Sequence, residues 1–549
     1  MTPTPSLLDI RGLSVRLPAG ADRALAVKEV SLSVAAGETL CIVGESGSGK
    51  SMIANAVMGL LPQPLVAPVA GSIAFQGQDL LALREPQWRA LRGNRIGMIF
   101  QDPMSALNPV MRIGEQLEEA LDAHLKLAPA EKRARILAAL RDVRLPDPEG
   151  IAASYPGRLS GGQRQRVMIA CALMLEPALL IADEPTTALD VTTQAQILEL
   201  IRDLQARQGT AVLFITHDFG VVSQIADRVA VMQTGAIVEA GDAADVLGNP
   251  RHDYTRKLIA AIPHGMPAAD CAVEPQPVLL DVRDLSKTYA SGGGLFRRAR
   301  QTAAMRGISF TLQRGEVLGL VGESGSGKST LGRCIAGLLA QDEGEILFNG
   351  QARGARPAPG RVQMVFQDPQ ASLNPRHTVG RSIMAGPLAQ GMAPQRARER
   401  AAELLRLVGL NPDAANRYPH EFSGGQRQRI GIARALASEP ELIVADEPVS
   451  ALDVSVQAQV LDLFANVRRQ FQLSMLFVTH DLRVAAQMCD RIAVMQQGRI
   501  IECGPAAQVI RAPSQAYTRE LVQAVPDFAS IISGRARLTG RSRLVEVAA

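Results

Sequence analysis

Apolar and polar residues follow the same pattern twice along this chain. Residues 7–15 and 30–34 largely alternate between apolar and polar side chains, and this period of two predicts antiparallel strands. Short uninterrupted apolar runs follow at residues 40–43, 178–182 and 211–215, and the last two are flanked by sequence of helical type. Runs of this length are typical of parallel strands that are buried on both faces.

The second half repeats this layout from residue 279 onward. In the first half, residues 88–174 are mostly helical in pattern and include the charged amphipathic stretch 128–143. Several motifs described below recur at one offset of 263 residues, as positions 423 against 160 and 480 against 217 show. A spacing that is kept over such a stretch indicates a rigid core in each half.

The repeat predicts two domains, residues 1–262 and 279–530. Residues 263–278 carry four prolines and are expected to form the linker between them. Residues 531–549 form a basic C-terminal tail with several arginines. A solvated tail is the simpler interpretation, and contact with acidic lipid headgroups or a partner is the alternative.

Composition narrows the class of protein only slightly. A chain of 549 residues with 47% apolar and 20% charged residues fits a packed globular protein of two to four domains. The net charge of +4 neither favours nor excludes nucleic acid as a partner. No stretch approaches the roughly 18 apolar residues of a membrane helix, and the first residues lack signal-peptide features, so we expect a cytosolic chain. The six cysteines form no C-x-x-C pair, and most are expected to pack in the core as reduced thiols.

The sequence GESGSGKS occurs in both halves, between an apolar run and a predicted helix at residues 51–61 or 329–339. It fits the phosphate-loop pattern, in which glycines allow backbone N–H groups to face phosphate oxygens at a helix N-terminus. A glycine-rich turn that matches by chance is the alternative, but it does not explain the same context twice. The residues expected to bind nucleotide are Gly44, Glu45, Ser46, Gly47, Ser48, Gly49, Lys50 and Ser51, and Gly322, Glu323, Ser324, Gly325, Ser326, Gly327, Lys328, Ser329 and Thr330. The lysines should reach the β- and γ-phosphates of the nucleotide, and Ser51 and Ser329 should ligate Mg²⁺.

Each half also has an apolar strand that ends in two acids, Asp183-Glu184 and Asp446-Glu447. Ligands bind beyond the carboxyl ends of strands in a parallel α/β sheet. At that position the aspartate can orient the shell of Mg²⁺, and the glutamate can polarise an attacking water as a general base.

A serine and two glycines open a helix in each half. Serine is a good N-cap, whereas each glycine costs roughly 1 kcal/mol relative to alanine, which suggests amides and a hydroxyl directed at an anion. These turns comprise Ser160, Gly161, Gly162 and Gln163, and Ser423, Gly424, Gly425 and Gln426.

Together these motifs resemble the ATP-binding cassette family over both halves, since LSGGQ is the signature of that family. The resemblance implies an α/β protein of two tandem phosphate-loop NTPase domains. Each would have a mixed sheet core, an antiparallel β subdomain and a helical signature subdomain. It also implies a head-to-tail sandwich in which each signature turn faces the nucleotide of the other half. The sets would be Lys50 and Glu184 with Ser423 and Gly425, and Lys328 and Glu447 with Ser160 and Gly162.

The remaining motifs of this family are present in order. By resemblance, Gln101 and Gln367 link Mg²⁺ to the helical subdomain, and Asp190 and Asp453 belong to the loop that crosses the interface between domains. His217 and His480 each follow an apolar strand in Thr-His-Asp and match the histidine that contacts the γ-phosphate. A lone histidine at a strand end is usually structural, so this role depends on the accompanying motifs.

One position departs from the family pattern. Tyr289 occupies the place of the aromatic residue that stacks on adenine, whereas the corresponding stretch of the first half offers Leu17. We expect loss of this stack to weaken ATP binding at the first site by about 1 kcal/mol.

Segments outside the catalytic motifs resemble one branch of the family. QDPMSALNP at residues 101–109 and QDPQASLNP at 367–375 are similar to a segment of dipeptide, oligopeptide and nickel importers. NPRHDYT at residues 249–255 resembles the sequence that ends the ATPase domain in that branch. Chains of this branch that join both ATPase domains, as this one does, resemble the ATPases of peptide and glutathione uptake systems. The resemblance implies ATP and Mg²⁺, two membrane permease subunits, an extracytoplasmic solute-binding protein, and a place at the cytoplasmic face of the inner membrane. Only Cys271 lies near the first domain end, so no iron–sulfur centre is expected.

Two other functions remain open at this stage. A twin-cassette ATPase that acts on ribosomes or nucleic acid has similar motifs, but such proteins usually have a long charged linker. An exporter ATPase is disfavoured only by the branch-specific segments. Nucleic acid is therefore not the expected partner, and the transported solute is not encoded in these domains.

Overall fold

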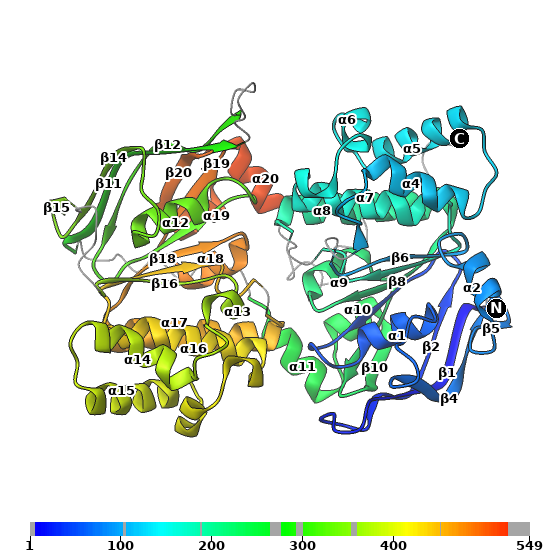
Figure 1. Cartoon of the computed structure of the whole chain (residues 1–549), viewed down its shortest axis with the longest axis horizontal. Coiled ribbons are helices and arrows are strands. Elements are labelled where there is room, and N and C mark those ends of the chain that lie inside the picture. The colour runs from blue at the N-terminus through cyan, green and yellow to red at the C-terminus, as the bar shows by residue number, and fades with distance from the viewer. Residues whose placement is uncertain are drawn as a thin grey trace. The chain divides into compact units, whose positions relative to one another are not determined.

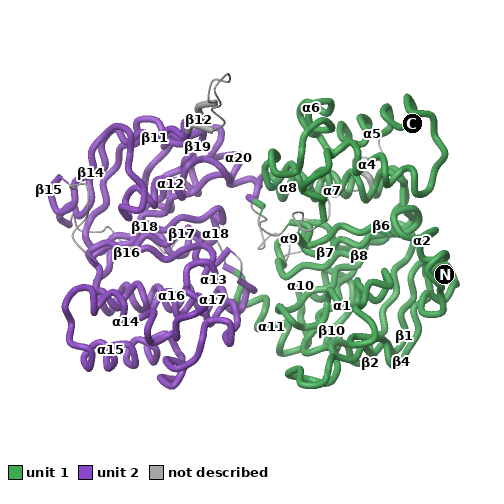
Figure 2. The backbone as a smooth tube through the Cα atoms, in the orientation of Figure 1, with its two compact units in different colours: residues 1–189, 193–262, 526–549 green, residues 190–192, 263–525 purple. Residues whose placement is uncertain are grey.

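A computed structural model gives the fold (Figure 1). It describes residues 6–102, 106–186, 189–263, 276–291, 300–352, 360–450 and 452–524. The described residues fall into two compact units, one of residues 6–189 and 193–262 and the other of 190–192 and 276–524 (Figure 2). Most of the expected linker, the loop at 292–299, Cys271 and the basic tail lie outside the described residues.

A six-stranded sheet forms the centre of each unit, with the strand orders β10-β9-β3-β8-β7-β6 and β16-β17-β18-β13-β19-β20. All neighbours are parallel except the edge strands β10 and β20, which are antiparallel to β9 and β19. The strands of the first unit are β3 Thr39–Val43, β6 Ile96–Ile99, β7 Leu179–Asp183, β8 Ala211–Thr216, β9 Arg228–Gln233 and β10 Ala236–Asp242. Those of the second are β13 Val317–Val321, β16 Val362–Val365, β17 Leu442–Asp446, β18 Ser474–Thr479, β19 Arg491–Gln496 and β20 Arg499–Pro505.

An antiparallel sheet of four strands accompanies each central sheet, in the orders β2-β1-β4-β5 and β12-β11-β14-β15. Its strands are β1 Ser6–Arg16, β2 Leu25–Ala35, β4 Ala67–Phe75 and β5 Gln78–Asp79, and β11 Val278–Ser291, β12 Arg300–Gln313, β14 Glu343–Phe348 and β15 Gln351–Ala352. In each unit this sheet and most of the helices lie on opposite sides of the central sheet (Figure 1).

The helices of the first unit are α1 Lys50–Val57, α2 Glu85–Leu91, α4 Ile113–Asp122, α5 Pro129–Asp142, α6 Pro148–Ala152, α7 Gly161–Leu173, α8 Val191–Gln208, α9 Phe219–Ile225, α10 Ala243–Gly248 and α11 Asp253–Ala260. Those of the second are α12 Lys328–Ala336, α13 Pro369–Ser372, α14 Val379–Ala389, α15 Pro394–Leu407, α16 Gly424–Ala437, α17 Val454–Phe471, α18 Leu482–Met488, α19 Ala506–Arg511 and α20 Ala516–Ala524. Short 3₁₀ turns lie at η1 Pro156–Arg158, η2 Pro412–Asn416 and η3 Pro419–Glu421.

The alternation of side chains along the central strands separates two apolar cores. In the second unit, Ile443 and Ala445 pack with the helices α14–α18, whereas Leu442 and Val444 pack with α12 and the antiparallel sheet. All four side chains are fully buried. Burial on both faces explains why these strands appear in the sequence as uninterrupted apolar runs.

The helix after each phosphate loop is shorter than the sequence pattern predicts. The first ends at Val57 rather than near residue 61, and the second ends at Ala336 rather than near residue 339. Gly59 and Gly337 follow with φ angles of 63° and 73°, a left-handed conformation that ends a helix readily only at glycine. The apolar residues beyond these glycines therefore misled the helix prediction.

The cysteines divide by burial. Cys41, Cys334 and Cys489 are buried free thiols, as expected for most cysteines of the chain. Cys171 is partly buried, and Cys503 is exposed on the edge strand β20, which differs from the expectation of core packing. Cys503 lies beside the guanidinium of Arg491, whose Nη2 donates to Sγ at 3.4 Å.

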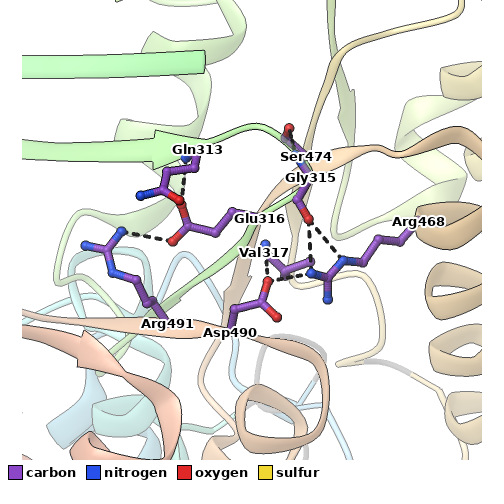
Figure 3. Close-up of polar contacts among 8 residues, drawn as sticks. All are labelled: Gln313, Gly315, Glu316, Val317, Arg468, Ser474, Asp490 and Arg491. Atoms are coloured by element: carbon purple, nitrogen blue, oxygen red, sulfur yellow. Dashed lines mark hydrogen bonds and ion pairs between the residues drawn. The ribbon is translucent and has the colours of Figure 1, made fainter. Parts of the chain in front are cut away.

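A polar network joins several elements where β13 begins, at the opposite end of that strand from the phosphate loop (Figure 3). Asp490 Oδ2 accepts from the Val317 N–H at 2.8 Å and from Arg468 Nη2 at 2.6 Å. Arg468 also donates to the carbonyl of Gly315 at 3.0 Å. Arg491 pairs with Glu316 at 2.9 Å. The network fixes α17, β13 and β19 to one another.

The first unit has the same network with a neutral residue in place of Arg468. Gln205 occupies the position of Arg468, donates to the Gly37 carbonyl at 2.9 Å and accepts from Thr39 Oγ1 at 3.1 Å. Asp227 Oδ2 accepts from the Thr39 N–H at 2.9 Å, as Asp490 does for Val317. The aspartate is thus shared, as is an arginine–glutamate pair, Arg228 with Glu38 at 3.1 Å, and the guanidinium of Arg468 is particular to the second half.

We predict that Asp490→Ala destabilises the second half by about 1–3 kcal/mol, because it leaves a buried N–H and the Arg468 charge without their acceptor. Arg468→Gln recreates the arrangement of the first half and should cost clearly less. Thermal unfolding of the full chain measures both variants. An equal loss from the two substitutions would contradict the assigned role of the carboxylate.

Candidate functional site

The predicted catalytic residues converge because three parallel strands end at one edge of the sheet. In the first unit β3, β7 and β8 run in the same direction and end at Val43, Asp183 and Thr216. The phosphate loop, Glu184 and His217 follow these ends directly. The second unit has the same arrangement after β13, β17 and β18.

The phosphate loop requires glycine where it meets its helix. Gly49 and Gly327 are the N-caps of α1 and α12, with left-handed φ angles of 109° and 103°. A Cβ atom at either position would collide with a carbonyl oxygen, that of Ala26 or Ala304. The loop backbone is therefore folded tightly against the antiparallel sheet, and its amides are fixed before any ligand binds.

The loop lysines lie folded over their own loops. Lys50 Nζ donates to the carbonyls of Gly44 and Glu45 at 2.8 and 2.9 Å. Lys328 Nζ donates to Gly322 and Glu323 at 2.7 Å each. Both residues are about 95% buried, and burial lowers the pKa of Lys328. An anion at this position would offset the cost of burying these charges.

The serine of each loop is joined to the aspartate that ends β7 or β17, two strands away from the strand that leads into the loop. Ser51 Oγ donates to Asp183 Oδ1 at 3.0 Å, and Ser329 Oγ donates to Asp446 Oδ1 at 2.9 Å. Burial raises the pKa of Asp183 to about 6 and also raises the pKa of Asp446, although the serine hydrogen bond opposes the shift. A hydroxyl and a buried carboxylate are oxygen donors of the kind that Mg²⁺ prefers.

Glutamine, glutamate and histidine meet at a single carboxylate oxygen in each unit. Glu184 Oε2 accepts from Gln101 Nε2 at 3.0 Å and lies 3.4 Å from His217 Nδ1. In the second unit, Glu447 Oε2 lies 2.9 Å from Gln367 Nε2 and 3.2 Å from His480 Nδ1.

Both glutamates have an unfavourable backbone conformation. The φ angles are 47° at Glu184 and 44° at Glu447, and each N–H donates at 2.9 Å to the adjacent strand, to Ile215 or Val478. Left-handed conformations of non-glycine residues are uncommon and concentrate at functional sites.

The glutamate and histidine of the second unit favour each other's charged form. Burial acts to raise the pKa of Glu447, but hydrogen bonding and charge from His480 outweigh it and lower the pKa. Burial likewise acts to lower the pKa of His480, and the Glu447 contact outweighs it and raises the pKa. The resting site therefore favours an ion pair that sequence motifs alone do not indicate.

The signature turns form the N-termini of α7 and α16. Ser160 Oγ accepts from the Gln163 N–H at 3.2 Å, and Gln163 Oε1 accepts from the Ser160 N–H at 3.0 Å. Ser423 and Gln426 form the same capping box. The N-cap role expected for both serines is confirmed.

The two glycines of each turn have different surroundings. A Cβ at Gly161 or Gly424 would meet nothing within 4 Å. A Cβ at Gly425 would collide with Val456 Cγ1 of α17, and one at Gly162 would lie 3.2 Å from Thr193 Cγ2 of α8. Helix packing is thus a second reason for glycine at position 425 and, more weakly, at position 162, and the anion-binding role expected from the sequence stays a prediction.

Other predicted residues lie on separate elements. Asp190 precedes α8 and accepts from Thr192 Oγ1 at 2.7 Å, and Asp453 is the N-cap of α17. Tyr289 lies on β11 and is 42% exposed, as a stacking surface must be, whereas Leu17 packs partly against the core of the first unit.

The sequence argument missed one contact of the phosphate loops. Tyr254 and Tyr517 each place a hydroxyl oxygen against a loop amide, that of Glu45 or Glu323. The sequence does show a tyrosine at the same position of the segment that ends each domain. Nothing in the sequence indicates that these segments contact the phosphate loops.

The described helices include none that is long and apolar enough to cross a bilayer. Within the described ranges, no cluster of three or more histidine, cysteine, aspartate or glutamate side chains is arranged to hold a metal ion. A magnesium site at the phosphate loop does not need such a cluster, because Mg²⁺ takes one or two carboxylates with waters and substrate phosphates.

Comparison with known families agrees with this site. A model described as "ABC transporter" matches residues 27–187 and 305–450. A second model, described as "Oligopeptide/dipeptide transporter, C-terminal region", matches residues 238–294 and 501–547. The fold and the two repeated sites thus define a class of twin-cassette ATPases.

Similar proteins cover nearly the whole chain. The peptidoglycan transport ATP-binding protein YejF of Agrobacterium fabrum is 47% identical over 95% of this chain and 97% of its own. The glutathione import ATP-binding protein GsiA of Salmonella choleraesuis is 46% identical over 95% of this chain and 89% of its own. This chain belongs to the ATP-binding cassette transporter family.

A solved structure of similar twin-cassette architecture is the complex of archaeal ribosomal stalk protein aP1 and the ribosome recycling factor aABCE1. It has a TM-score of 0.61 and 21% identity, and the match covers 90% of both chains. This likeness shows the shared fold alone.

We predict that Gly425→Ala destabilises the second unit by about 1–3 kcal/mol, because the added methyl group collides with Val456. Gly424→Ala has space for its methyl group and should leave the unfolding temperature nearly unchanged. Thermal unfolding measures the stability of both variants, and ATPase assays of the same preparations measure their activity. Equal stability of the two variants would contradict the packing explanation.

We predict that the pKa of His480 lies above its ordinary value of 6.5 in the nucleotide-free protein and falls in Glu447→Gln, where the charge of Asp481 is left to oppose the effects of burial and Lys328. NMR titration of isotope-labelled histidine measures both, and only seven histidines need assignment. The ion pair should stabilise the fold most between the ordinary pKa values of 4.5 and 6.5. Its contribution should decline as the pH rises through the raised pKa of His480 or falls through the lowered pKa of Glu447. An unchanged His480 pKa in the variant would contradict the pairing.

Proposed function

We propose that this protein is the ATP-hydrolysing subunit of an importer for peptides or related small solutes. The match of both domain ends to the oligopeptide/dipeptide C-terminal region carries this proposal. It is supported by relatives named for glutathione import and peptidoglycan transport. Dipeptides, oligopeptides, glutathione-like peptides and nickel complexes are the candidate solutes, since the ATPase itself need not touch the solute.

In the proposed reaction, the residues of each half divide the work of phosphoryl transfer to water. Lys50 and Lys328 leave their loop carbonyls for the β- and γ-phosphates of ATP. Glu184 and Glu447 polarise the attacking water, and proton transfer of this kind contributes about 10²- to 10⁴-fold to a rate. His217 and His480 hold these glutamates in place and contact the γ-phosphate.

The donor set at each loop fits Mg²⁺. Ser51, Asp183 and Gln101 would hold it in the first half, and Ser329, Asp446 and Gln367 in the second. When bound, Mg²⁺ neutralises charge on the β- and γ-phosphates. The amide NH₂ of each glutamine already donates to the catalytic glutamate, which leaves the amide oxygen available for the metal.

We also propose that each signature turn completes the nucleotide site of the other half, as the family resemblance implies. Ser423 with Gly425 would serve the ATP held by Lys50, and Ser160 with Gly162 the ATP held by Lys328. The helix N-termini at these turns favour negative charge. Asp190 and Asp453 would belong to the loops that cross the interface between the two halves. Tyr289 would stack on adenine in the second site.

The proposed partners are two membrane permease subunits and, indirectly, an extracytoplasmic solute-binding protein. The chain would then lie at the cytoplasmic face of the inner membrane. A permease loop would dock at a cleft in the helical part of the first unit, on the segment that follows Gln101. Its lining includes Leu107, Met111, Ile113, Gln116, Val167 and Cys171.

A ribosome-associated function is the weaker candidate. The similarity to the recycling factor is confined to the fold at 21% identity, whereas the transport-named relatives reach 46–47%. Affinity purification of the chain from its own cells separates the two. Co-purifying permease subunits support import, and ribosomes without permeases contradict it.

We predict that the double variant Glu184→Gln and Glu447→Gln lowers ATP hydrolysis by about 10²-fold or more, because no carboxylate remains to polarise water. Release of inorganic phosphate at saturating MgATP measures the rate. The matched control is Glu85→Gln with Glu399→Gln, which makes the same charge change at two exposed sites and should hydrolyse ATP normally. Undiminished hydrolysis in the catalytic variant would contradict the mechanism.

A further inference from the structure

The domain-end segment of each half is anchored to the edge strand by one glutamate. Glu239 on β10 accepts from the N–H groups of Arg251 and His252 at 2.7 and 3.1 Å. In the second half, Glu502 on β20 accepts from the N–H groups of Ser514 and Gln515 at 2.8 and 3.2 Å. The anchored residues immediately precede α11 or α20, so the start of each helix is fixed against the sheet.

A tyrosine on the first turn of each helix reaches the phosphate loop of the same half. The hydroxyl oxygen of Tyr254 accepts from the Glu45 N–H at 3.3 Å, and that of Tyr517 accepts from the Glu323 N–H at 3.0 Å. The two residues are 9% and 7% exposed. The contact occurs independently in both halves, and both tyrosines lie inside the matched C-terminal regions.

The amide that each tyrosine contacts belongs to the peptide unit that the loop lysine also holds. The carbonyl of Gly44 and the N–H of Glu45 are two ends of one planar peptide. Lys50 Nζ donates to this carbonyl at 2.8 Å, and Tyr254 accepts from its N–H. Rotation of the peptide would break both hydrogen bonds. When the lysine turns to a phosphate, the tyrosine still holds the peptide from the other side.

We propose that Tyr254 and Tyr517 are positioning residues that keep the two phosphate loops in the shape that receives nucleotide. The C-terminal region of each half thereby supports its own nucleotide site. This proposal rests on the proposed function, because it assumes that the loops bind ATP.

The expected consequence is on nucleotide affinity rather than on the maximal rate. A preformed loop avoids the cost of ordering its backbone when ligand binds. Without the hydroxyl, the peptide can rotate and its buried N–H loses an acceptor. Once nucleotide is bound, the phosphates themselves order the loop, so the step at saturating ATP should change little.

Single-site chains test this directly. In a Lys328→Ala background, isothermal titration with MgADP reports on the first site, and Tyr254→Phe should weaken binding about 3- to 10-fold. The matched control is Thr255→Val, which removes a fully buried hydroxyl beside the anchoring carboxylate of Glu239 without touching the loop. Glu239 keeps its two backbone donors in this variant. Its affinity should stay within twofold. The second site is tested in the same way in a Lys50→Ala background, with Tyr517→Phe as the variant and Thr518→Val as the control.

In the otherwise unaltered chain, Tyr254→Phe with Tyr517→Phe should raise the KM for ATP 3- to 10-fold and leave kcat within twofold. If the tyrosine variants match the threonine controls in MgADP affinity and KM, the contacts only stabilise the fold and the proposal is wrong. A fall in kcat without a change in KM would also overturn it. If the parent single-site chains bind no MgADP at all, the proposed function fails first, and this inference fails with it.

Discussion

The contact between a phosphate-loop serine and the aspartate at the end of a strand two places away in the sheet is the constraint on which the site depends. Ser51 with Asp183, and Ser329 with Asp446, join the loop after the first core strand to the end of another strand. Strands β7 and β17, which end in the aspartates, and strands β3 and β13, which lead into the loops, are buried on both faces. Their ends are therefore fixed by packing on either side of the sheet. The side chains at that edge therefore have little freedom, which suits a site that must bind triphosphate without rearranging its backbone.

Three local features of the chain determine the shape of this edge of the sheet. Glycine allows the phosphate loop to approach the antiparallel sheet closely, as Gly49 does against Ala26. Glu184 and Glu447 adopt left-handed backbones that are held by hydrogen bonds to the next strand. Tyr254 on α11 and Tyr517 on α20 each accept a hydrogen bond from an amide of the phosphate loop. In the second half, the pair of His480 and Glu447 completes the site and gives it a charge distribution that depends on pH.

Much of this was predictable from sequence because the determining patterns are local. Apolar runs marked the core strands, GESGSGKS marked the loops, and Ser160 and Ser423 marked two helix starts. Long-range contacts were not predictable in the same way. No local signal links Tyr254 to Glu45, which lies 209 residues away. Likewise, the packing reason for Gly425 lies in Val456 on another helix. The early ends of α1 and α12 show that a single glycine outweighs the apolar residues that follow it.

The two halves are similar but not equivalent. The first half has Gln205 beside the start of β3, where the second half has Arg468 beside the start of β13. The first half has Leu17 at the position that corresponds to Tyr289 in the second. The proposed catalytic groups are present in both halves, so we expect both halves to bind nucleotide. The most direct test is the stoichiometry of MgATP bound at equilibrium by a full chain whose hydrolysis has been blocked at both glutamates. The account predicts two nucleotides per chain, with the first site the weaker, and a saturating value of one or none would contradict it.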